Sequence, residues 1–438
     1  MDLLKDNVGK LYRKFFIASF GSALIACIYG LVDMAMVGQY HGPDGSAAMA
    51  VIAPIWNIIY SFGLLCGIGG SVIYAVARGE RDDVKEANGY FTSAFILGVS
   101  WALILWVLVW VCEEPLLRLF GANDALMPLC KEYMVAPKLT VPVYVFINLL
   151  SSFLRNDGDP GRATKAVIFG GIFNVFGDYF FVFTLDMGIK GAGIATAMGA
   201  SMSVLVMLTH FISKKNTLKF VKPLRILNSF KMISVNGFSS FIVDVAMGIA
   251  TMLFNRRVME YLGTDALAVY GVIVVVGTLV QCCSYGIGQA AQPVISRNFG
   301  AGLTDRIKTM LKYNIITAAV FGAIWTVLSM AMPQVFIKLF MTPTPEVLSI
   351  APGIIRIYAI SFVLLPFNIY STYYFQAIMR AKISLIASVA RGIVISGALI
   401  LLLPVAFGGN AVWWAMPITE AVVFVYSAVM MKKVKLSR

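Results

Sequence analysis

Long apolar stretches recur along almost the entire chain, from Phe15 to Met431, and short polar turns separate them. Each stretch reaches the length of about 20 residues that an α-helix needs to cross the hydrocarbon core of a bilayer. Charged residues make up only 13% of the chain and hydrophobic residues 59%, whereas about 25% of the residues in soluble domains are charged. The stretches lack the alternation of apolar and polar residues that barrel strands show. The sequence therefore predicts an all-α integral membrane protein.

The apolar stretches predict twelve transmembrane helices and leave no room for a sizeable soluble domain. The first stretch follows a basic start but lacks the small-residue cleavage site of a secretory signal, so we expect a retained helix. An even number of crossings places both termini on one side of the membrane. The expected spans are 15–38, 47–78, 88–112, 130–154, 163–184, 189–212, 231–256, 265–297, 309–332, 350–379, 383–407 and 411–431.

Most lysine and arginine residues fall on the side of the membrane where both termini are expected. By the positive-inside rule this side is cytoplasmic, so we expect a multi-pass protein of the inner (plasma) membrane with both termini in the cytoplasm. The net charge of +13 does not indicate nucleic-acid binding, because the basic residues lie in short connections between apolar stretches. The basic clusters lie within residues 5–14, 78–85, 155–165, 214–231, 297–312, 380–382 and 432–438.

The two halves of the chain resemble each other. The segment Tyr40–Asp44 (YHGPD) recurs as Tyr261–Asp265 (YLGTD), and Gly67-Ile-Gly69 recurs as Gly286-Ile-Gly288. Because an even number of helices in each half preserves its orientation, we expect two parallel six-helix lobes related by a pseudo-twofold axis along the membrane normal. The expected organisation is an N-lobe over residues 1–212, a cytoplasmic linker over 213–230 and a C-lobe over 231–438.

Two carboxylates fall inside the first and fifth expected helices. Asp33 and Asp178 each follow a polar residue by four positions, Tyr29 and Asn174, which places each pair on one helix face. A charge inside the bilayer costs at least about 2.5–3.5 kcal/mol on insertion scales, so each carboxylate needs a partner or a function. Two carboxylates in one partly desolvated cavity favour binding of a proton or, together with amide and hydroxyl oxygens, of Na⁺. The alternative is that both accept structural hydrogen bonds near helix ends.

Ionisable residues also fall inside the expected helices of the second half. Asp244 lies near the middle of the seventh helix, where substrate binding and structural hydrogen bonding are equally consistent with its position. Arg391 and Glu420 fall at similar depth in consecutive helices, which favours a structural ion pair over contact with substrate. Five amides are candidates for the lining of a substrate cavity, although interhelical hydrogen bonds are their commoner use. They are Gln281, Gln289, Gln292, Asn368 and Gln376.

Two motifs that the sequence lacks limit the possible energy sources for transport. The sequence contains no G-x-x-x-x-G-K-[ST] loop for nucleotide phosphates, and its two histidines are too few for a histidine relay. We therefore expect a secondary transporter driven by an ion gradient, and not an enzyme. No cofactor is expected beyond the coupling ion, H⁺ or Na⁺.

Six segments of the sequence match one family of transporters. They are Asp33–Gly38, Arg155–Gly158, Asn174–Asp178, Met187–Thr196, Gly286–Pro293 and Asn298–Gly302. Through them the sequence resembles the multidrug and toxic compound extrusion (MATE) family over essentially the whole chain, in the branch of the staphylococcal-type multidrug exporters. The resemblance implies a V-shaped arrangement of two lobes and alternating-access export of amphipathic, often cationic compounds by antiport with H⁺ or Na⁺.

The resemblance also implies an ion site in the N-lobe. The residues that match it are Tyr29, Asp33, Asn174, Asp178 and Thr196, and the expected Na⁺ ligands among them are Asp33, Asn174, Asp178 and Thr196. Some members of the family have a second carboxylate pair in the C-lobe. Asp244 matches one of its acids, but the tenth helix carries no acid between Leu365 and Tyr374. This departure argues against a C-lobe Na⁺ site.

Acids and amides dominate the expected cavity, with Asp244, Gln281, Gln289 and Asn368 as its candidate residues. The main alternatives are a flippase for lipid-linked saccharides and a metabolite exporter of the same superfamily. A flippase cavity should be strongly basic in order to hold pyrophosphate, which favours the drug exporter here. We expect a monomer whose partners are small organic substrates and membrane lipid.

Overall fold

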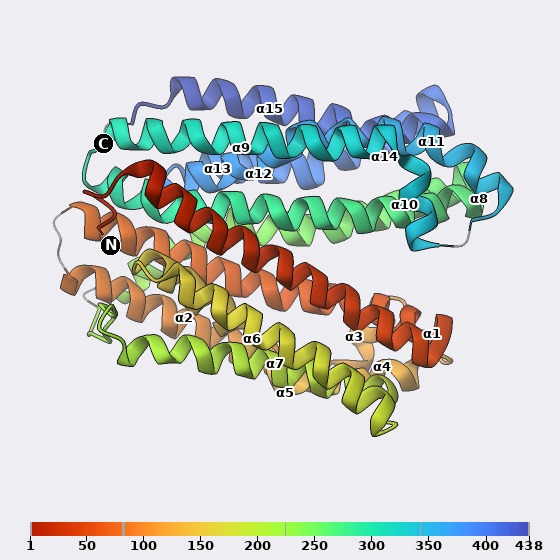
Figure 1. Ribbon diagram of the computed structural model, residues 1–438, viewed down its shortest axis with the longest axis horizontal. Helices are drawn as coiled ribbons and strands as arrows, with labels where there is room; N and C mark the ends of the chain where they lie inside the picture. The colour runs from red at the N-terminus through yellow and green to blue at the C-terminus, as the bar shows by residue number, and fades with distance from the viewer. Residues whose placement is uncertain (1, 81–83, 224, 342, 437–438) are drawn as a thin grey trace.

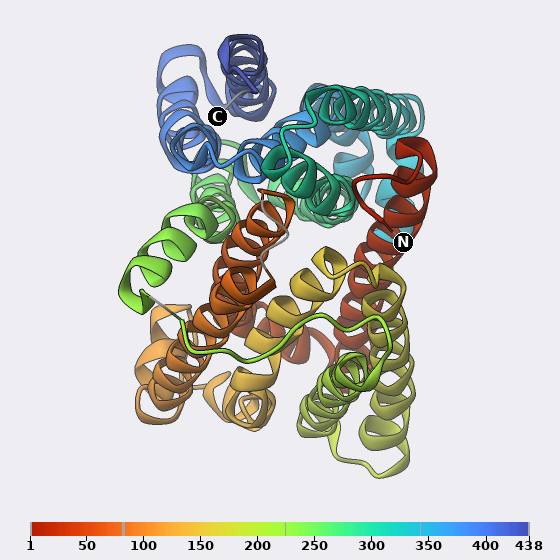
Figure 2. The same ribbon diagram turned by 90° about the vertical axis from the view of Figure 1, so that its left-hand side faces the viewer.

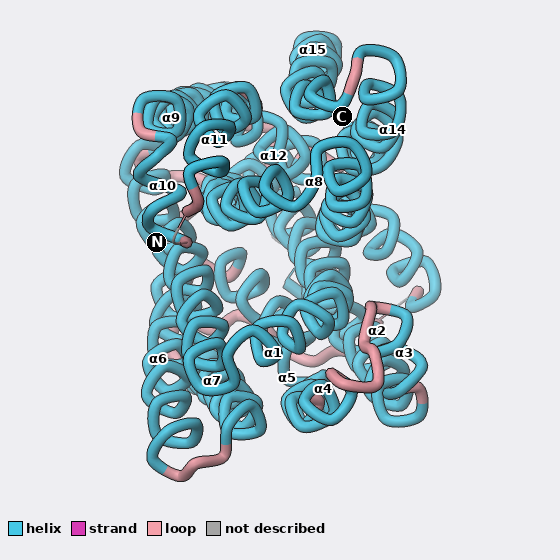
Figure 3. Tube along the Cα trace, turned by 90° about the vertical axis from the view of Figure 1, so that its right-hand side faces the viewer, coloured by secondary structure: helices cyan, strands magenta, loops and turns pink. Residues whose placement is uncertain are grey.

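The computed structural model describes residues 2–80, 84–223, 225–341 and 343–436, so the expected positive charges of Arg81 and Arg438 lie outside it. Helices account for almost all of this part of the chain, and it contains no strand (Figure 3). Eleven of its segments are long and apolar enough to cross a membrane. One of them, Ile226–Gly300, is interrupted by Gly263 at φ 80° and ψ −170°. The arrangement is therefore consistent with the expected twelve crossings.

The first half begins with α1 (Val8–Glu80), a 73-residue element that Gly42 divides at φ 65° and ψ −145° into two limbs, Val8–Gly42 and Asp44–Glu80. Only a residue without a Cβ adopts this backbone conformation readily. The other elements are α2 (Val84–Val111), α3 (Glu113–Leu119), α4 (Met127–Tyr133), α5 (Val135–Asn156), α6 (Pro160–Asp178), a π-helical turn (Tyr179–Thr184), α7 (Gly188–Leu208) and a 3₁₀ turn (Thr209–Ile212).

The second half begins with α8 (Ile226–Gly300), whose limbs, residues 226–262 and 264–300, meet at Gly263. Helix α8 starts earlier than residue 231, so the linker is shorter than expected. The following elements are α9 (Thr304–Ala331), α10 (Pro333–Phe340), α11 (Pro345–Ala359), α12 (Ser361–Ala377), α13 (Ala381–Val389), a π-helical turn (Ala390–Val394), α14 (Ile395–Phe407), a 3₁₀ turn (Gly409–Trp414) and α15 (Ala415–Lys433).

Proline explains one of two differences from the expected spans. The span 130–154 consists of two helices, α4 and α5, because Pro137 has no N–H to bond the carbonyl of Tyr133, where α4 ends. The span 350–379 also consists of two helices, α11 and α12, which meet at Ile360.

The helices form two groups that lie side by side at one end of the molecule and diverge toward the other, as in a V (Figure 1). Both termini lie at the end where the groups meet, which we call the termini end; the opposite end is the far end. Figure 2 views the termini end and shows the extended segment of residues 213–223 running across it between α7 and α8.

The start of each half packs on the other half. Leu11 and Phe15 of α1 belong to the hydrophobic core of the second half, and the Tyr12 hydroxyl donates a 2.5 Å hydrogen bond to Thr317 Oγ1 of α9. Conversely, Ile233 of α8 belongs to a core of the first half. The two groups therefore exchange the beginnings of their first helices, and residues 213–230 connect the halves without separating them in packing.

Glycines let the backbones of the two halves touch at the termini end. A Cβ on Gly79 would lie 2.0 Å from the carbonyl oxygen of Arg297, and a Cβ on Gly300 would lie 2.0 Å from that of Val76. Farther along, a Cβ on Gly237 would lie 2.1 Å from the carbonyl oxygen of Leu65. The contact between α1 and α8 therefore depends on the absence of side chains at these positions.

We predict that Gly79→Ala lowers the Tm of the detergent-solubilised protein. In a helix interior this change normally stabilises by about 0.5–1 kcal/mol, but overpacking of a tight contact typically costs about 1–3 kcal/mol. The matched control is Gly271→Ala, because Gly271 is exposed on α8 with nothing within 4 Å of an added Cβ. Thermal unfolding should give opposite signs for the two changes, and equal Tm values would contradict the proposed contact.

Candidate functional site

Close packing of α6 on α7 sets the position of the polar residues in the first half. A Cβ on Gly199 of α7 would lie 2.6 Å from the carbonyl oxygen of Gly170 and 2.9 Å from Cβ of Asn174, both on α6. This approach brings Asn174 beside Thr196 of α7, and Asn174 Nδ2 donates a 3.3 Å hydrogen bond to Thr196 Oγ1.

Asp33 comes to this pair from the first limb of α1. Its side chain is 7% exposed, and Oδ2 accepts a 3.0 Å hydrogen bond from the Tyr133 hydroxyl of α4. The Thr196 hydroxyl lies near the Asp33 carboxylate. Asp178, at the last position of α6, is fully buried and lies within electrostatic range of Asp33. The structure thus brings together the four expected Na⁺ ligands.

Several oxygens of this cluster have no hydrogen-bond partner among the described residues: Asp33 Oδ1, Asn174 Oδ1 and both carboxylate oxygens of Asp178. Buried polar atoms are normally paired, and two neighbouring carboxylates repel each other in a medium of low dielectric constant. Carboxylate, amide and hydroxyl oxygens are hard ligands, and a carboxylate can equally take a proton. The residues present therefore fit either H⁺ or Na⁺.

A cluster of the type that binds transition metals is absent from the part of the chain that the structure describes, where no group of three or more His, Cys, Asp or Glu side chains could hold a metal ion. The candidate site instead combines two carboxylates with one amide and one hydroxyl group.

Tyr29 lies between this cluster and the second half. A Cβ on Gly171 of α6 would lie 3.0 Å from Cδ1 of Tyr29, so the ring packs on α6, and its hydroxyl is near both Asp33 and Cys282 of α8. The tyrosine that donates a hydrogen bond to Asp33 is Tyr133, not Tyr29.

Sequence reasoning missed Tyr133. It lies near the beginning of the expected helix 130–154, at the membrane interface, where a tyrosine usually serves as an anchor. Its contact with Asp33 spans 100 residues of sequence. A local pattern does not report such a contact, because it arises only from the packing of α4 against α1.

Asp244 forms a short polar chain in the second half. Its Oδ1 accepts a 2.7 Å hydrogen bond from the Tyr285 hydroxyl, whose oxygen accepts a 2.6 Å bond from Gln281 Nε2. Asp244 Oδ2 is buried without a partner in the described residues. Gln281 lines a cavity of about 80 Å³, while Gln289 is partly exposed and lies near the Tyr373 side chain.

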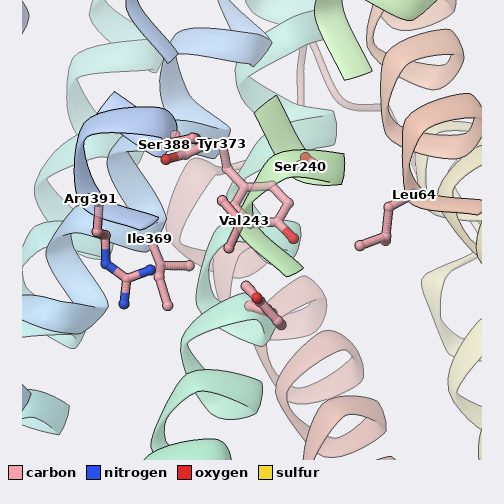
Figure 4. A pocket seen from close by; sticks show the side chains of 9 residues that line it. Leu64, Ser240, Val243, Ile369, Tyr373, Ser388 and Arg391 are labelled. Atoms are coloured by element: carbon pink, nitrogen blue, oxygen red, sulfur yellow. The ribbon is translucent and has the colours of Figure 1, made fainter. Parts of the chain in front are cut away.

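A second, smaller cavity, of about 10 Å³, lies where the halves meet (Figure 4). Tyr373, Ser388 and Arg391 of the second half line it, and Leu64 of α1 lies on the opposite side. Tyr285, whose hydroxyl donates a hydrogen bond to Asp244, also lines this cavity.

The expected pair of Arg391 and Glu420 is present. Arg391 Nε lies 2.7 Å from Glu420 Oε1, and Glu420 is fully buried. Asn368, which we expected in the substrate cavity, is 1% exposed and donates through Nδ2 to Glu420 Oε2 at 2.6 Å. Asn368 therefore completes the hydrogen bonding of the ion pair, and its buried amide does not face an open cavity.

Replacing one member of this pair should destabilise the protein more than replacing both. Arg391→Met leaves a buried carboxylate, a loss of about 3–5 kcal/mol. In the double variant Arg391→Met/Glu420→Gln the glutamine still accepts from Asn368 and no charge remains, so much of the stability should return. Folded yield and Tm in detergent measure both. A double variant as unstable as Arg391→Met would contradict the pairing.

Two groups of membrane-length helices that diverge from one end, with buried carboxylates inside one group, have the architecture of a secondary transporter. The MatE family model matches residues 18–180 and 236–401, so the chain belongs to the MatE family and is a multi-pass membrane protein. The two matched segments cover most of both halves.

Relatives and solved structures agree with this assignment. The chain is 24% identical to the "Multidrug export protein MepA" of Staphylococcus haemolyticus over 426 residues, which are 95% of this chain and 92% of that protein. Identity to the Staphylococcus aureus (strain MSSA476) protein of the same name is 22%, with the same coverage. A structure described as an outward-facing MATE family transporter of the MOP superfamily superposes with a TM-score of 0.89 at 23% identity, covering 98% of this chain and 97% of that one. A MOP superfamily transporter from Pyrococcus furiosus gives a TM-score of 0.88 at 22% identity, covering 99% and 98%.

Proposed function

We propose that this protein exports amphipathic, often cationic organic compounds by antiport with H⁺ or Na⁺. The observation that carries the proposal is the buried cluster of Asp33 and Asp178, whose unpartnered oxygens offer a site for a small cation. The names of the relatives, multidrug export proteins, support the same substrate class. The protein performs no chemical reaction and uses no cofactor in this proposal.

In this proposal, ion binding changes how the two halves are arranged because α1 contacts both the ion site and the second half. A bound cation offsets the repulsion between Asp33 and Asp178 and holds the first limb of α1 against α6. The same limb begins in the core of the second half, around Leu11 and Phe15. Release of the ion therefore changes the balance between arrangements of the two halves, which is the coupling that antiport requires.

The substrate binds between the halves in this proposal, near Asp244 and the aromatic side chains of Tyr285 and Tyr373. A carboxylate and aromatic rings are groups that attract organic cations. The two groups of helices touch at the termini end and diverge at the far end. In this proposal the substrate therefore leaves toward the side of the membrane opposite the termini.

We also propose that the termini end faces the cytoplasm and that the protein works as a monomer in the inner (plasma) membrane. Lysine and arginine residues at the termini end support this orientation through the positive-inside rule. Its partners are then small organic substrates and membrane lipid.

Efflux from proteoliposomes tests the proposal. Purified protein is reconstituted with a fluorescent organic cation, and a pH gradient or a Na⁺ gradient is imposed separately. We expect dye movement against its own gradient with at least one of the two ions, and none without a gradient. Dye movement that ignores both gradients would contradict antiport, and transport of lipid-linked saccharide without dye would favour a flippase.

A further inference from the structure

A short segment ahead of α1 is folded against the second half. Residues 2–7, which we call the amino-terminal segment, form a turn in which the backbone N–H of Asp6 donates a 3.0 Å hydrogen bond to the Asp2 carbonyl. Leu3 is 7% exposed and belongs to the hydrophobic core of the second half. The segment therefore packs on the second half, although the helix that follows it belongs to the first.

Two polar side chains of the second half bind the backbone of this segment. Arg306 Nη2 donates hydrogen bonds to the carbonyl oxygens of Asp6 at 2.7 Å and of Leu3 at 3.1 Å. Asn298 Nδ2 donates to the same Leu3 carbonyl at 3.1 Å. Arg306 Nε donates to Asn298 Oδ1 at 2.8 Å, and Asn298 is fully buried. The two side chains therefore form one binding site for the backbone of the amino-terminal segment, and its charged donor makes the stronger bonds.

The turn between α8 and α9 brings these two side chains together. The backbone N–H of Leu303 donates to the Asn298 carbonyl at 2.9 Å, and that of Gly302 donates to the Phe299 carbonyl at 3.1 Å. Gly302 lies at φ 72°, and this pattern is the Schellman ending of a helix. It directs the chain so that Arg306 of α9 reaches Asn298 at the end of α8. This stretch, which carries part of the family resemblance, thus forms the receptor for the amino-terminal segment.

The first half binds the segment that precedes α8 in a similar way. Asn88 of α2 donates through Nδ2 to the Thr217 carbonyl at 3.1 Å and accepts the backbone N–H of Lys219 at 3.0 Å. The backbone N–H of Val221 donates to Thr92 Oγ1, also on α2, at 3.0 Å. Each half therefore binds the backbone of the segment that leads into the first helix of the other half.

The contact between the halves continues along the second limb of α1. Leu64, Ile68, Val72 and Val76 recur every four residues on one helix face and belong to the core of the second half. At the termini end, the Val76 carbonyl oxygen would lie 2.0 Å from a Cβ on Gly300. The Val76 side chain is 3% exposed, so separation of the halves at this end would expose it.

We propose that the amino-terminal segment is a latch that holds the two halves together at the termini end. The first limb of α1 runs from Val8 to Gly42 and crosses from α9 toward α6 (Figure 1). While Asn298 and Arg306 hold the start of this limb on the second half, the limb spans both halves and opposes their separation. Release of the segment removes this restraint, and the termini end then opens more often. The latch does not depend on the substrate or the coupling ion proposed above.

Alkylation of a cysteine at position 76 tests the latch. Val76→Cys is introduced into the full-length protein in detergent, and its reaction rate with N-ethylmaleimide is followed by mass spectrometry of the labelled peptide. This reporter is combined with Arg306→Gln, with Arg306→Lys and with deletion of residues 2–6. Lys308→Gln is the matched control, because Lys308 is an exposed cation of the same helix, 3.6 Å from Asp305.

We expect Arg306→Gln and the deletion each to speed alkylation at position 76 at least about ten-fold, because charge-assisted hydrogen bonds of the closed arrangement are lost. Arg306→Lys should give a smaller increase, because it keeps the charge but lacks the planar fork that bridges two carbonyls. Lys308→Gln should change the rate less than about two-fold. The native Cys130, fully buried in a core of the first half, should react no faster in any variant.

Unchanged alkylation at position 76 in the deletion variant or in folded Arg306→Gln would overturn the latch, and so would fast alkylation in the protein with Val76→Cys alone. A parallel rise at Cys130 would show that the segment supports the whole fold, which also overturns it. If Arg306→Gln does not fold, the deletion variant decides by the same two rates. The experiment contains no substrate and no ion gradient, so failure of the latch leaves the proposed export function standing.

Discussion

Asp33→Asn should abolish gradient-driven dye efflux and leave the protein folded. The change keeps the shape of the side chain, and the amide still offers an oxygen to the Tyr133 hydroxyl, which lies 3.0 Å from Asp33 Oδ2. It removes one of the two negative charges of the cluster, so the electrostatic attraction for a cation becomes much weaker. Efflux from liposomes under imposed pH and Na⁺ gradients should fall at least about a hundred-fold, the upper range of a 1–3 kcal/mol coupling free energy.

The same experiment separates this role from a structural one. Asp178→Asn should give the same loss, and the double variant should be no worse than either single variant, because one site is broken once. Asp186→Asn is the control, since Asp186 is exposed and accepts a hydrogen bond from Tyr40. Near wild-type efflux in well-folded Asp33→Asn at several pH values would refute the assignment.

His210→Ala should strongly destabilise the protein. His210 is fully buried between two acids, with Nε2 2.8 Å from Asp157 Oδ2 and Nδ1 3.3 Å from Asp159 Oδ2. Asp157 also holds the segment between the halves through the backbone N–H of Thr217. Removing the imidazole takes one hydrogen-bond partner from each of two buried carboxylates, a loss of about 1–3 kcal/mol for each acid.

The chain contains its own control for this prediction, because His41 is its only other histidine. His41 Nε2 accepts one 3.0 Å hydrogen bond, from the backbone N–H of Ile189. His41→Ala should therefore cost no more than about 1–3 kcal/mol, the range for one buried donor left unpaired. Thermal unfolding of the two variants in the same detergent measures the difference, and equal Tm values would show that the acid cluster adds nothing.

The same cluster predicts how stability depends on pH. Burial acts to raise the pKa of Asp159, but the Lys215 ammonium, together with His210 and Arg162, outweighs it and lowers this pKa below its ordinary value. A carboxyl group with a lowered folded-state pKa stabilises the fold above its unfolded pKa of about 3.9, and the contribution disappears as pH falls through the folded value. The Tm difference between wild type and Lys215→Met should be constant above about pH 5 and shrink in more acidic buffer.

Local features of the sequence determined the membrane-spanning architecture. The thickness of the bilayer sets the length of each apolar stretch, so the helices could be located from composition alone, and Gly42 and Gly263 break α1 and α8 between expected spans. Asp33 and Asp178 stood out for the same reason, because a carboxylate inside an apolar stretch is visible without knowledge of its neighbours.

Contacts between distant segments were decided only by the tertiary structure. The hydrogen bond from Tyr133 to Asp33 and the backbone contacts at Gly79 and Gly300 depend on which helices pack together. Helical periodicity reports which face of a helix is apolar, but it does not report which partner covers that face. Which helices pair depends on the packing of the whole protein. Residues that contact each other across helices could therefore not be predicted from any single stretch of sequence.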